Sequence, residues 1–145
     1  TLAGSEAVSA TGGTAEGHLL AFIAASLRPP VMEAGSLVLW AGYLHKLRNE
    51  PEMLAVHEAS YLGYRNTLES LIAALPRTST PERDRSDAIA VTAMVDGLWI
   101  EGSLLPGSFG ATELITIALQ SIGAILGIDL AAHAHHLPEV GKSEP

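Results

Sequence analysis

AVTAMVDGLWIEGSLL, residues 90–105, is the stretch that decides the fold. It predicts a helix that is apolar on nearly every side, with one acid and one glycine at its centre. A helix on the surface of a protein needs only one apolar stripe, so a helix that is apolar all round must be covered on two sides. We therefore expect one side of this helix in the protein's own core and another side against a partner chain.

Outward from this stretch, apolar residues recur at helical spacing over residues 15–28, 31–48, 51–75, 81–105 and 111–127. Thr14 and Thr80 are typical N-caps, Pro81 follows Thr80 in the first turn, and Gly127 is a typical C-cap. No alternating strand pattern of any length appears. The sequence therefore predicts an all-α fold of about five main helices. We expect a frayed linker over 1–13, a helical domain over 14–130 and a flexible tail over 131–145.

The composition limits the possible partners. The chain has 145 residues, which suffices for one domain, and its net charge of −8 includes only 8 Lys and Arg residues with no basic run. Nucleic-acid binding needs a basic surface, so this chain should not bind DNA by itself. The longest uncharged apolar run, residues 114–128, is shorter than the roughly 20 residues of a membrane span. We expect no membrane contact, and the absence of cysteine is compatible with the cytoplasm.

Catalytic motifs are absent from the sequence, which contains no nucleophile elbow, phosphate-binding loop, zinc-protease motif or dinucleotide fingerprint. Asp96 and Glu101 lie five residues apart and do not share a helix face. We expect neither an enzyme nor a cofactor. His133, His135 and His136 form a small cluster. Although imidazoles bind zinc and nickel, we interpret this cluster as part of a solvated tail and expect no metal site.

Trp40, Tyr61, Tyr64, Met94 and Trp99 are large groups on three of the expected helices. His57, Tyr61 and Tyr64 follow one another at helical spacing. Ligand pockets are mostly apolar, with a few converging polar groups, and aromatic faces attract cations. The alternative is that these side chains simply fill the core. The candidate ligand-binding residues are Phe22, Trp40, Leu44, His57, Tyr61, Tyr64, Met94 and Trp99.

The last two expected helices each carry apolar residues on more than one side. If two chains meet around a two-fold axis, these helices form an intersubunit four-helix bundle. In the alternative, a monomer, the other helices cover both sides. The candidate dimer-interface residues are Val91, Val95, Leu98, Leu105, Ile115, Leu119, Ile122 and Leu126.

Four segments together resemble a known family. They are LVLWAGYLHKLRNEPEML at 37–54, YRNTLESLIAALP at 64–76, AIAVTAMVDGLWIEGSL at 88–104, and the closing apolar helix. In this order and spacing, they resemble the C-terminal regulatory domain of TetR-family transcriptional repressors, most of all the BetI branch. Two positions depart from that branch: Ser36 replaces a tryptophan, and Glu101 stands where the branch often has a basic residue.

The resemblance implies a homodimer that binds an unidentified small-molecule effector. It also implies that the effector relieves repression by shifting the population of two arrangements of DNA-reading heads. Nothing in residues 1–18 resembles the family's recognition helix, so operator DNA would be contacted only through an N-terminal helix-turn-helix domain that this chain lacks. The alternative is a stand-alone helical binding or scaffold module without a DNA-binding function.

Overall fold

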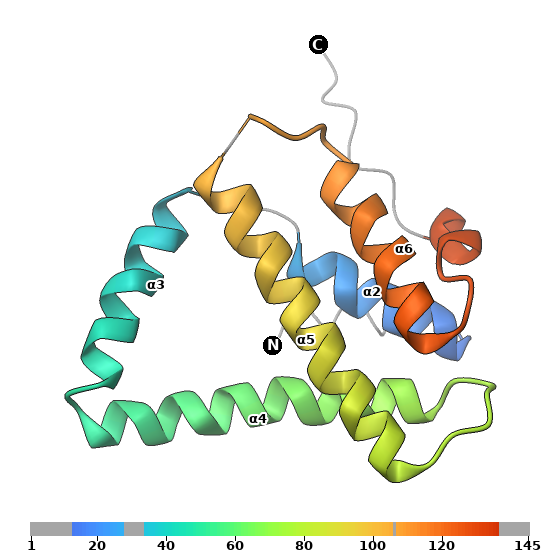
Figure 1. Cartoon of the computed structure of the whole chain (residues 1–145), viewed down its shortest axis with the longest axis horizontal. Helices are drawn as coiled ribbons and strands as arrows, with labels where there is room; N and C mark the ends of the chain where they lie inside the picture. The colour runs from blue at the N-terminus through green and yellow to red at the C-terminus, as the bar shows by residue number, and fades with distance from the viewer. Residues whose placement is uncertain (1–12, 28–33, 106, 137–145) are drawn as a thin grey trace.

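The structure is a computed structural model that describes residues 13–27, 34–105 and 107–136, with the backbone alone for 34–37 and 134–136. All five expected helices are present, and the described residues contain no strand, so the all-α prediction is confirmed (Figure 1). None of the described helices is long and apolar enough to cross a membrane. The elements are α2 (Ala15–Ser26), α3 (Ala34–Leu47), α4 (Pro51–Ala73), α5 (Pro81–Leu104), α6 (Glu113–Leu126) and the short 3-10 helix η1 (Ala131–His136).

The helices begin where the capping residues predict. The Thr14 hydroxyl accepts a hydrogen bond from the Gly17 N–H at 3.0 Å, and the Thr80 hydroxyl accepts one from the Arg83 N–H at 3.2 Å. Each bond satisfies a backbone donor that has no partner within the helix. Gly127 ends α6 in the left-handed conformation, with φ 72°. These local signals fix the start of α2 and α5 and the end of α6.

The segment after Leu130 differs from the expected flexible tail. Residues 131–136 form η1, which begins where the Asp129 carboxylate accepts a hydrogen bond from the Ala132 N–H at 3.1 Å. η1 packs against α2 and α6, so a local capping interaction and tertiary contacts extend the ordered fold beyond 130. The rest of the expected tail, 137–145, and residues 1–12 of the expected linker lie outside the described residues.

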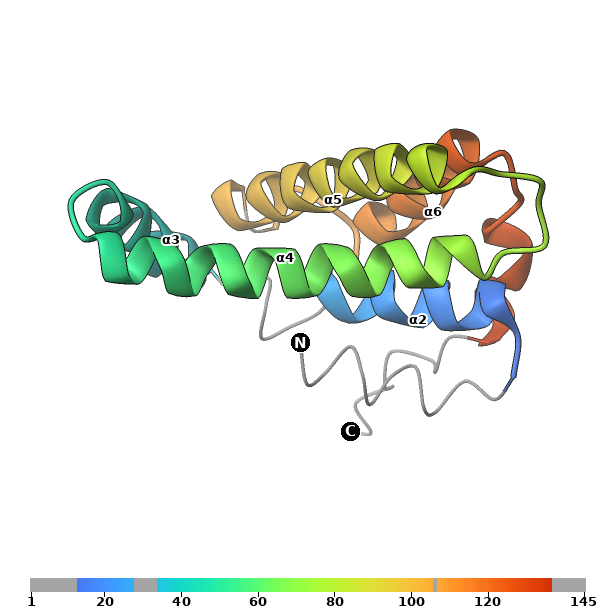
Figure 2. The ribbon, with the colours of Figure 1, turned by 90° about the horizontal axis from the view of Figure 1, so that it is seen from below.

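The core lies between two layers of helices: α2 with the second half of α4, and α5 with α6 (Figure 2). α3 stands apart from this bundle. Among its described side chains only Leu47 is buried, and α3 packs mainly on α4 and α5. The fully buried side chains that fill the core are Leu19, Leu20, Ile23, Leu68, Ile72, Val91, Ile122 and Leu130.

A buried charge cluster joins the α4–α5 turn to the end of α6. The Arg77 guanidinium contacts the carboxylates of Asp84 at 3.0 Å and Asp87 at 2.7 Å, and it donates a hydrogen bond to the Leu126 carbonyl at 3.0 Å. Arg83 pairs with the other Asp87 oxygen at 2.9 Å. The carbonyls at the end of a helix carry partial negative charge and attract cations. The cluster therefore holds the end of α6 against the start of α5.

The apolar stripes of α5 and α6 face inward, which corrects our expectation for the dimer interface. Six of the eight expected interface side chains are at most 9% exposed within a single chain and therefore offer no surface to a partner. The reason is that α5 and α6 pack against each other, with α4 against α5 and α2 against α6, so the strongest apolar stripe of each helix is already covered. Leu98 also packs against this core, and only Leu105 is exposed. The six buried residues are Val91, Val95, Ile115, Leu119, Ile122 and Leu126.

Candidate functional site

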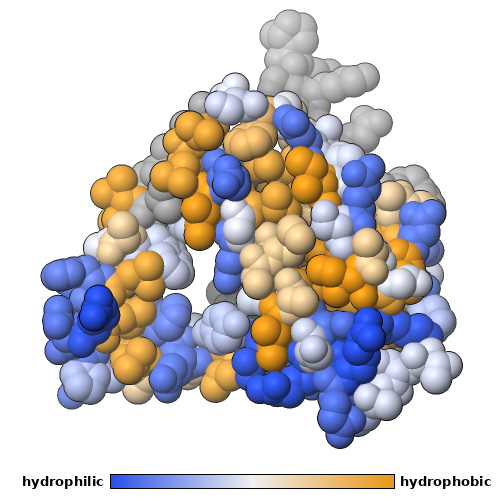
Figure 3. Space-filling model, viewed as in Figure 1, coloured by the Kyte–Doolittle hydropathy of each residue, from blue (hydrophilic) through white to orange (hydrophobic). Residues whose placement is uncertain are grey.

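Helices α3, α4 and α5 surround an opening, visible in the space-filling view (Figure 3). It exists because α3 and the first half of α4 extend away from the bundle. Between Pro51 and Thr67, no α4 residue is fully buried, although Tyr64 is partly buried against the core. Most side chains on this half of α4 therefore stay accessible from solvent.

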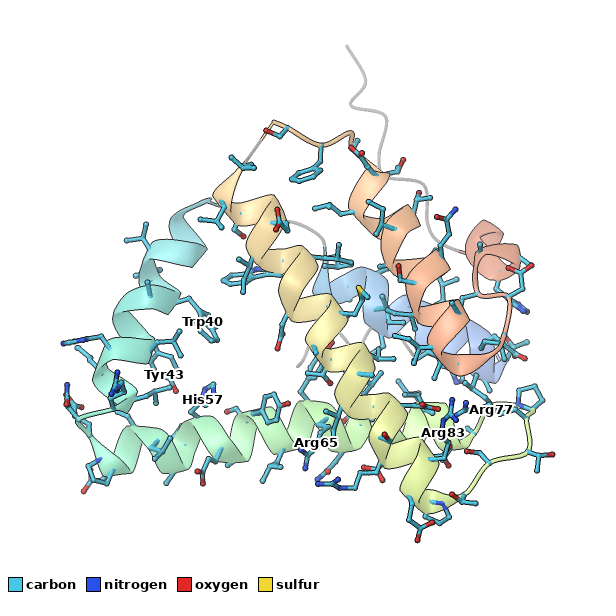
Figure 4. The ribbon with its side chains drawn as sticks, viewed as in Figure 1. Trp40, Tyr43, His57, Arg65, Arg77 and Arg83 are labelled. Atoms are coloured by element: carbon cyan, nitrogen blue, oxygen red, sulfur yellow. The ribbon has the colours of Figure 1, made fainter. Side chains whose placement is uncertain are left out.

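A row of aromatic rings connects the three helices around this opening. The Trp40 ring on α3 lies 6.0 Å from the Trp99 ring on α5 and 6.4 Å from the His57 ring on α4, measured between centroids. His57 also contacts Tyr43 at 5.6 Å and stacks on Tyr61 at 6.4 Å. Figure 4 shows Trp40 and Tyr43 reaching from α3 toward the His57 side of α4. These separations are typical of favourable aromatic pairs.

Tyr64 extends the α4 side of this row toward the bundle. Its ring lies 4.9 Å from that of Phe22, and its hydroxyl shares a 3.0 Å hydrogen bond with the Ser26 hydroxyl on α2. Burial raises the pKa of the Tyr64 phenol, the bond to Ser26 opposes this rise, and the negative charge of Asp96 adds to it. The phenol therefore stays protonated and available as a hydrogen-bond partner.

Asp96 brings an acid from α5 close to Tyr64, as its electrostatic effect on that phenol shows. Its carboxylate keeps contact with solvent but makes no hydrogen bond or ion pair with any described residue. Desolvation by its neighbours raises the pKa of the Asp96 carboxyl. The residue is nevertheless exposed, so its carboxylate oxygens remain accessible from solvent.

The eight expected ligand-binding residues fall into two groups. Trp40, His57, Tyr61 and Trp99 meet in the aromatic row, Leu44 is exposed one turn after Trp40, and Tyr64 lies where α4 meets the bundle. Phe22 belongs to the core and is only 3% exposed because α2 lies under α4, so the core-filling alternative describes it. Met94 is partly buried and packs against the core, as Tyr64 and Trp99 also do.

Two features of this site were missing from the sequence prediction. Tyr43 belongs to the aromatic row, and its position three residues after Trp40, on the same side of a helix, was a usable signal. The Arg65 guanidinium lies 5.7 Å from the centroid of the Tyr61 ring, in a cation–π contact. That contact depends on side-chain direction, which helical spacing alone does not give.

A pocket of about 480 Å³ lies elsewhere, on the outer side of α6. It contains no aromatic ring and none of the expected ligand-binding residues, and it is open to solvent. Among the described residues, no group of three or more His, Cys, Asp or Glu side chains is arranged to hold a metal ion. The pocket is lined by Leu119, Gln120, Gly123, Ala124, Gly127, Ile128, Asp129, Leu130 and Ala131.

Comparison with known proteins agrees with this architecture. A crystal structure of a candidate transcriptional regulator from Pseudomonas aeruginosa superposes with a TM-score of 0.78 at 22% identity, over 90% of this chain and 64% of the other, which shows the shared fold. The HTH-type transcriptional regulator BetI of Burkholderia thailandensis is 25% identical over 109 residues, which cover 75% of this chain and 54% of that protein. The chain thus spans less than two thirds of either relative.

The family comparison covers most of the helical domain. The model of the BetI-type transcriptional repressor C-terminal domain matches residues 15–127, from the start of α2 to the end of α6. This range contains the opening, the aromatic row and the α5–α6 pair. The chain therefore belongs to the family of BetI-type, TetR-like transcriptional repressors, of which it represents the C-terminal domain.

Proposed function

We propose that this domain binds a small-molecule effector and holds two copies of the chain together. The observation that carries the effector proposal is the Trp40–Trp99 contact, which closes a row of rings across three helices around the opening. Ligand sites are concave and mainly apolar, with a small number of polar groups that fix orientation. The aromatic row supplies the apolar surface, and Tyr64 and Asp96 supply the polar groups.

Dimerisation is proposed through the outward sides of α5 and α6. The inward sides are used by the core, but both helices also expose apolar and small residues: Leu104 is 58% exposed and Ile117 is 37% exposed. Ala93, Gly97 and Ala124 are exposed on the same two helices and would let two chains approach closely. Two such helices from each chain complete a four-helix bundle around a two-fold axis.

Operator DNA is proposed to contact a helix-turn-helix segment of the full-length regulators rather than this domain. The net charge of −8 opposes direct contact with phosphates. An effector that binds one arrangement of the dimer more tightly than another would shift the population toward it and so change DNA affinity. The domain's role is therefore regulatory rather than catalytic.

A thermal-shift screen tests effector binding with quaternary amines, aromatic acids and lipids. A true effector present at 100 times its dissociation constant stabilises the folded state by about 2.7 kcal/mol. We expect Trp40→Ala to abolish the shift, because it removes the ring that links α3 to α5. The matched control is Leu39→Ala, which alters a neighbouring side chain that is 77% exposed. A hit that stabilises Trp40→Ala as much as the unmodified protein would place the effector site elsewhere.

A further inference from the structure

Asp96 and the aromatic row together specify the chemical class of the effector. Asp96 precedes Trp99 by three residues on α5, so their Cβ atoms are about 5–6 Å apart on the same side of the helix. Trp99 contacts Trp40 across the opening, and Asp96 acts on Tyr64 of α4. A carboxylate and an aromatic surface are therefore presented side by side.

The carboxylate makes no ion pair with any described residue. The Arg65 guanidinium lies over the ring of Tyr61, 5.7 Å from its centroid. A carboxylate accepts hydrogen bonds, and charge-assisted bonds from an ammonium group are the strongest of these. The negative net charge of the chain also favours the approach of a cation.

The geometry of the rings distinguishes between kinds of cation. The rings in the row contact one another, with 5.6–6.4 Å between the centroids of neighbouring pairs, and do not stand apart around an empty box. A cation without N–H groups gains only ring faces, and it cannot donate a hydrogen bond to Asp96. A cation with N–H groups satisfies the carboxylate, while its apolar part lies along the rings.

We propose that the opening binds a protonated primary or secondary amine that carries a flat apolar group. Asp96 accepts the ammonium hydrogen bonds, and the Trp40–Trp99 pair covers the flat group. This inference rests on the proposed effector-binding function and narrows it to one ligand class.

The test uses tryptophan fluorescence, because Trp40 and Trp99 are the two tryptophans of the chain. Four probes share one phenyl ring and a two-carbon linker: phenethylamine, its trimethylated ammonium, phenethyl alcohol and phenylpropionate. We expect phenethylamine to bind at least about tenfold more tightly than each of the others, since a hydrogen bond to a charged group contributes about 1.5–3 kcal/mol. Equal or tighter binding by any of the other three overturns the amine assignment. The same holds if none of the four changes the fluorescence.

Two variants locate the charge that is responsible. Asp96→Asn should weaken phenethylamine binding about tenfold and leave phenethyl alcohol unaffected, whereas Glu101→Gln, which removes the same charge from an exposed position on α5, should change neither. Circular dichroism checks that both variants fold, and the four-probe comparison on the unmodified chain stands without them. Unchanged amine binding by Asp96→Asn overturns the role of the Asp96 carboxylate.

If phenethyl alcohol or phenylpropionate binds best, the amine class fails while the effector site stands. Failure of the broader thermal-shift screen would instead reject the site itself.

Discussion

At the scale of single residues, Asp96 shows how position decides the behaviour of a side chain. In the sequence it is an acid in an apolar stretch with no identifiable partner. In the structure it lies near the Tyr64 phenol and has no direct hydrogen bond or ion pair within the described part of the chain. Partial desolvation raises the pKa of its carboxyl, although the residue stays exposed to solvent. Its carboxylate therefore remains accessible to a ligand donor.

The raised pKa of the Asp96 carboxyl predicts a pH-dependent stability. The folded state holds this proton more tightly than the unfolded state does, so the free energy of unfolding falls as pH rises from the ordinary aspartate pKa through the raised one. Asp96→Asn removes this loss, and it should be more stable than the unmodified protein at neutral pH, with a gain that disappears at acid pH. Because the side chain keeps contact with solvent, we expect a difference below about 1 kcal/mol.

Urea unfolding of both proteins, followed over a pH series at one protein concentration, measures this difference directly. Glu101→Gln provides the control for the change in net charge. A gain that stays constant from acid to neutral pH would show that ionisation of Asp96 is not its cause.

At the scale of the elements, each side of α5 has a different neighbour. Val91 and Val95 face the core, Trp99 reaches α3 across the opening, and Ala93 and Gly97 are exposed. The apolar character of the whole helix follows from these three surroundings. The end of α6 is equally constrained, because the Arg77 cluster and the turn after Leu126 both fix it.

Gly123 provides a test of the close packing at the end of α6. A Cβ atom at this position would lie 2.7 Å from the Ile128 carbonyl oxygen, so the backbone of the following turn would have to move. We expect Gly123→Ala to lower the free energy of unfolding by about 1–3 kcal/mol through overpacking. Chemical denaturation followed by circular dichroism measures the change.

The matched control is Gly63→Ala in α4, where a Cβ atom would meet nothing within 4 Å. This variant should gain about 1 kcal/mol, because alanine is the better helix former. If Gly123→Ala proves equally stabilising, the turn after α6 is free to shift and the close contact with Ile128 does not constrain it.

At the scale of the whole molecule, the structure separates a core, an opening and an outer α5–α6 surface. The core needs only α2, half of α4, α5 and α6. This leaves α3 and the rest of α4 to form the site, and leaves the outer sides of α5 and α6 for a partner (Figure 3). The proposed effector site and the proposed dimer surface share α5, which offers a direct physical link between them.

Ile117→Glu tests the proposed dimer surface. The Ile117 side chain is 37% exposed on α6, so the fold should be kept. In the proposed dimer the new charge would be buried without a partner, which opposes association. We expect dimerisation at least about tenfold weaker by analytical ultracentrifugation. Val56→Glu, on an exposed α4 position away from this surface, is the control. Equal association of both variants and the unmodified chain would remove Ile117 from the interface, and a monomeric unmodified chain would reject dimerisation.

The sequence alone determined the five helices, the caps Thr14, Thr80 and Gly127, and most of the aromatic residues that border the opening. These properties are local, because helical spacing and capping chemistry act within a few residues. It also predicted which residues share a side of α5 or α6. However, it assigned the apolar stripes that contain Val91 and Ile115 to a dimer interface, and it assigned Phe22 to the ligand site.

Only the tertiary structure decided which neighbour each side meets. The packing of α2, α4, α5 and α6 against one another turned these stripes into the core, and the packing of α3 on α4 brought Tyr43 into the aromatic row. The same arrangement left Asp96 without an ion pair among the described residues. The physical reason is that periodicity fixes directions around one helix axis, whereas contacts depend on how several axes are placed relative to one another.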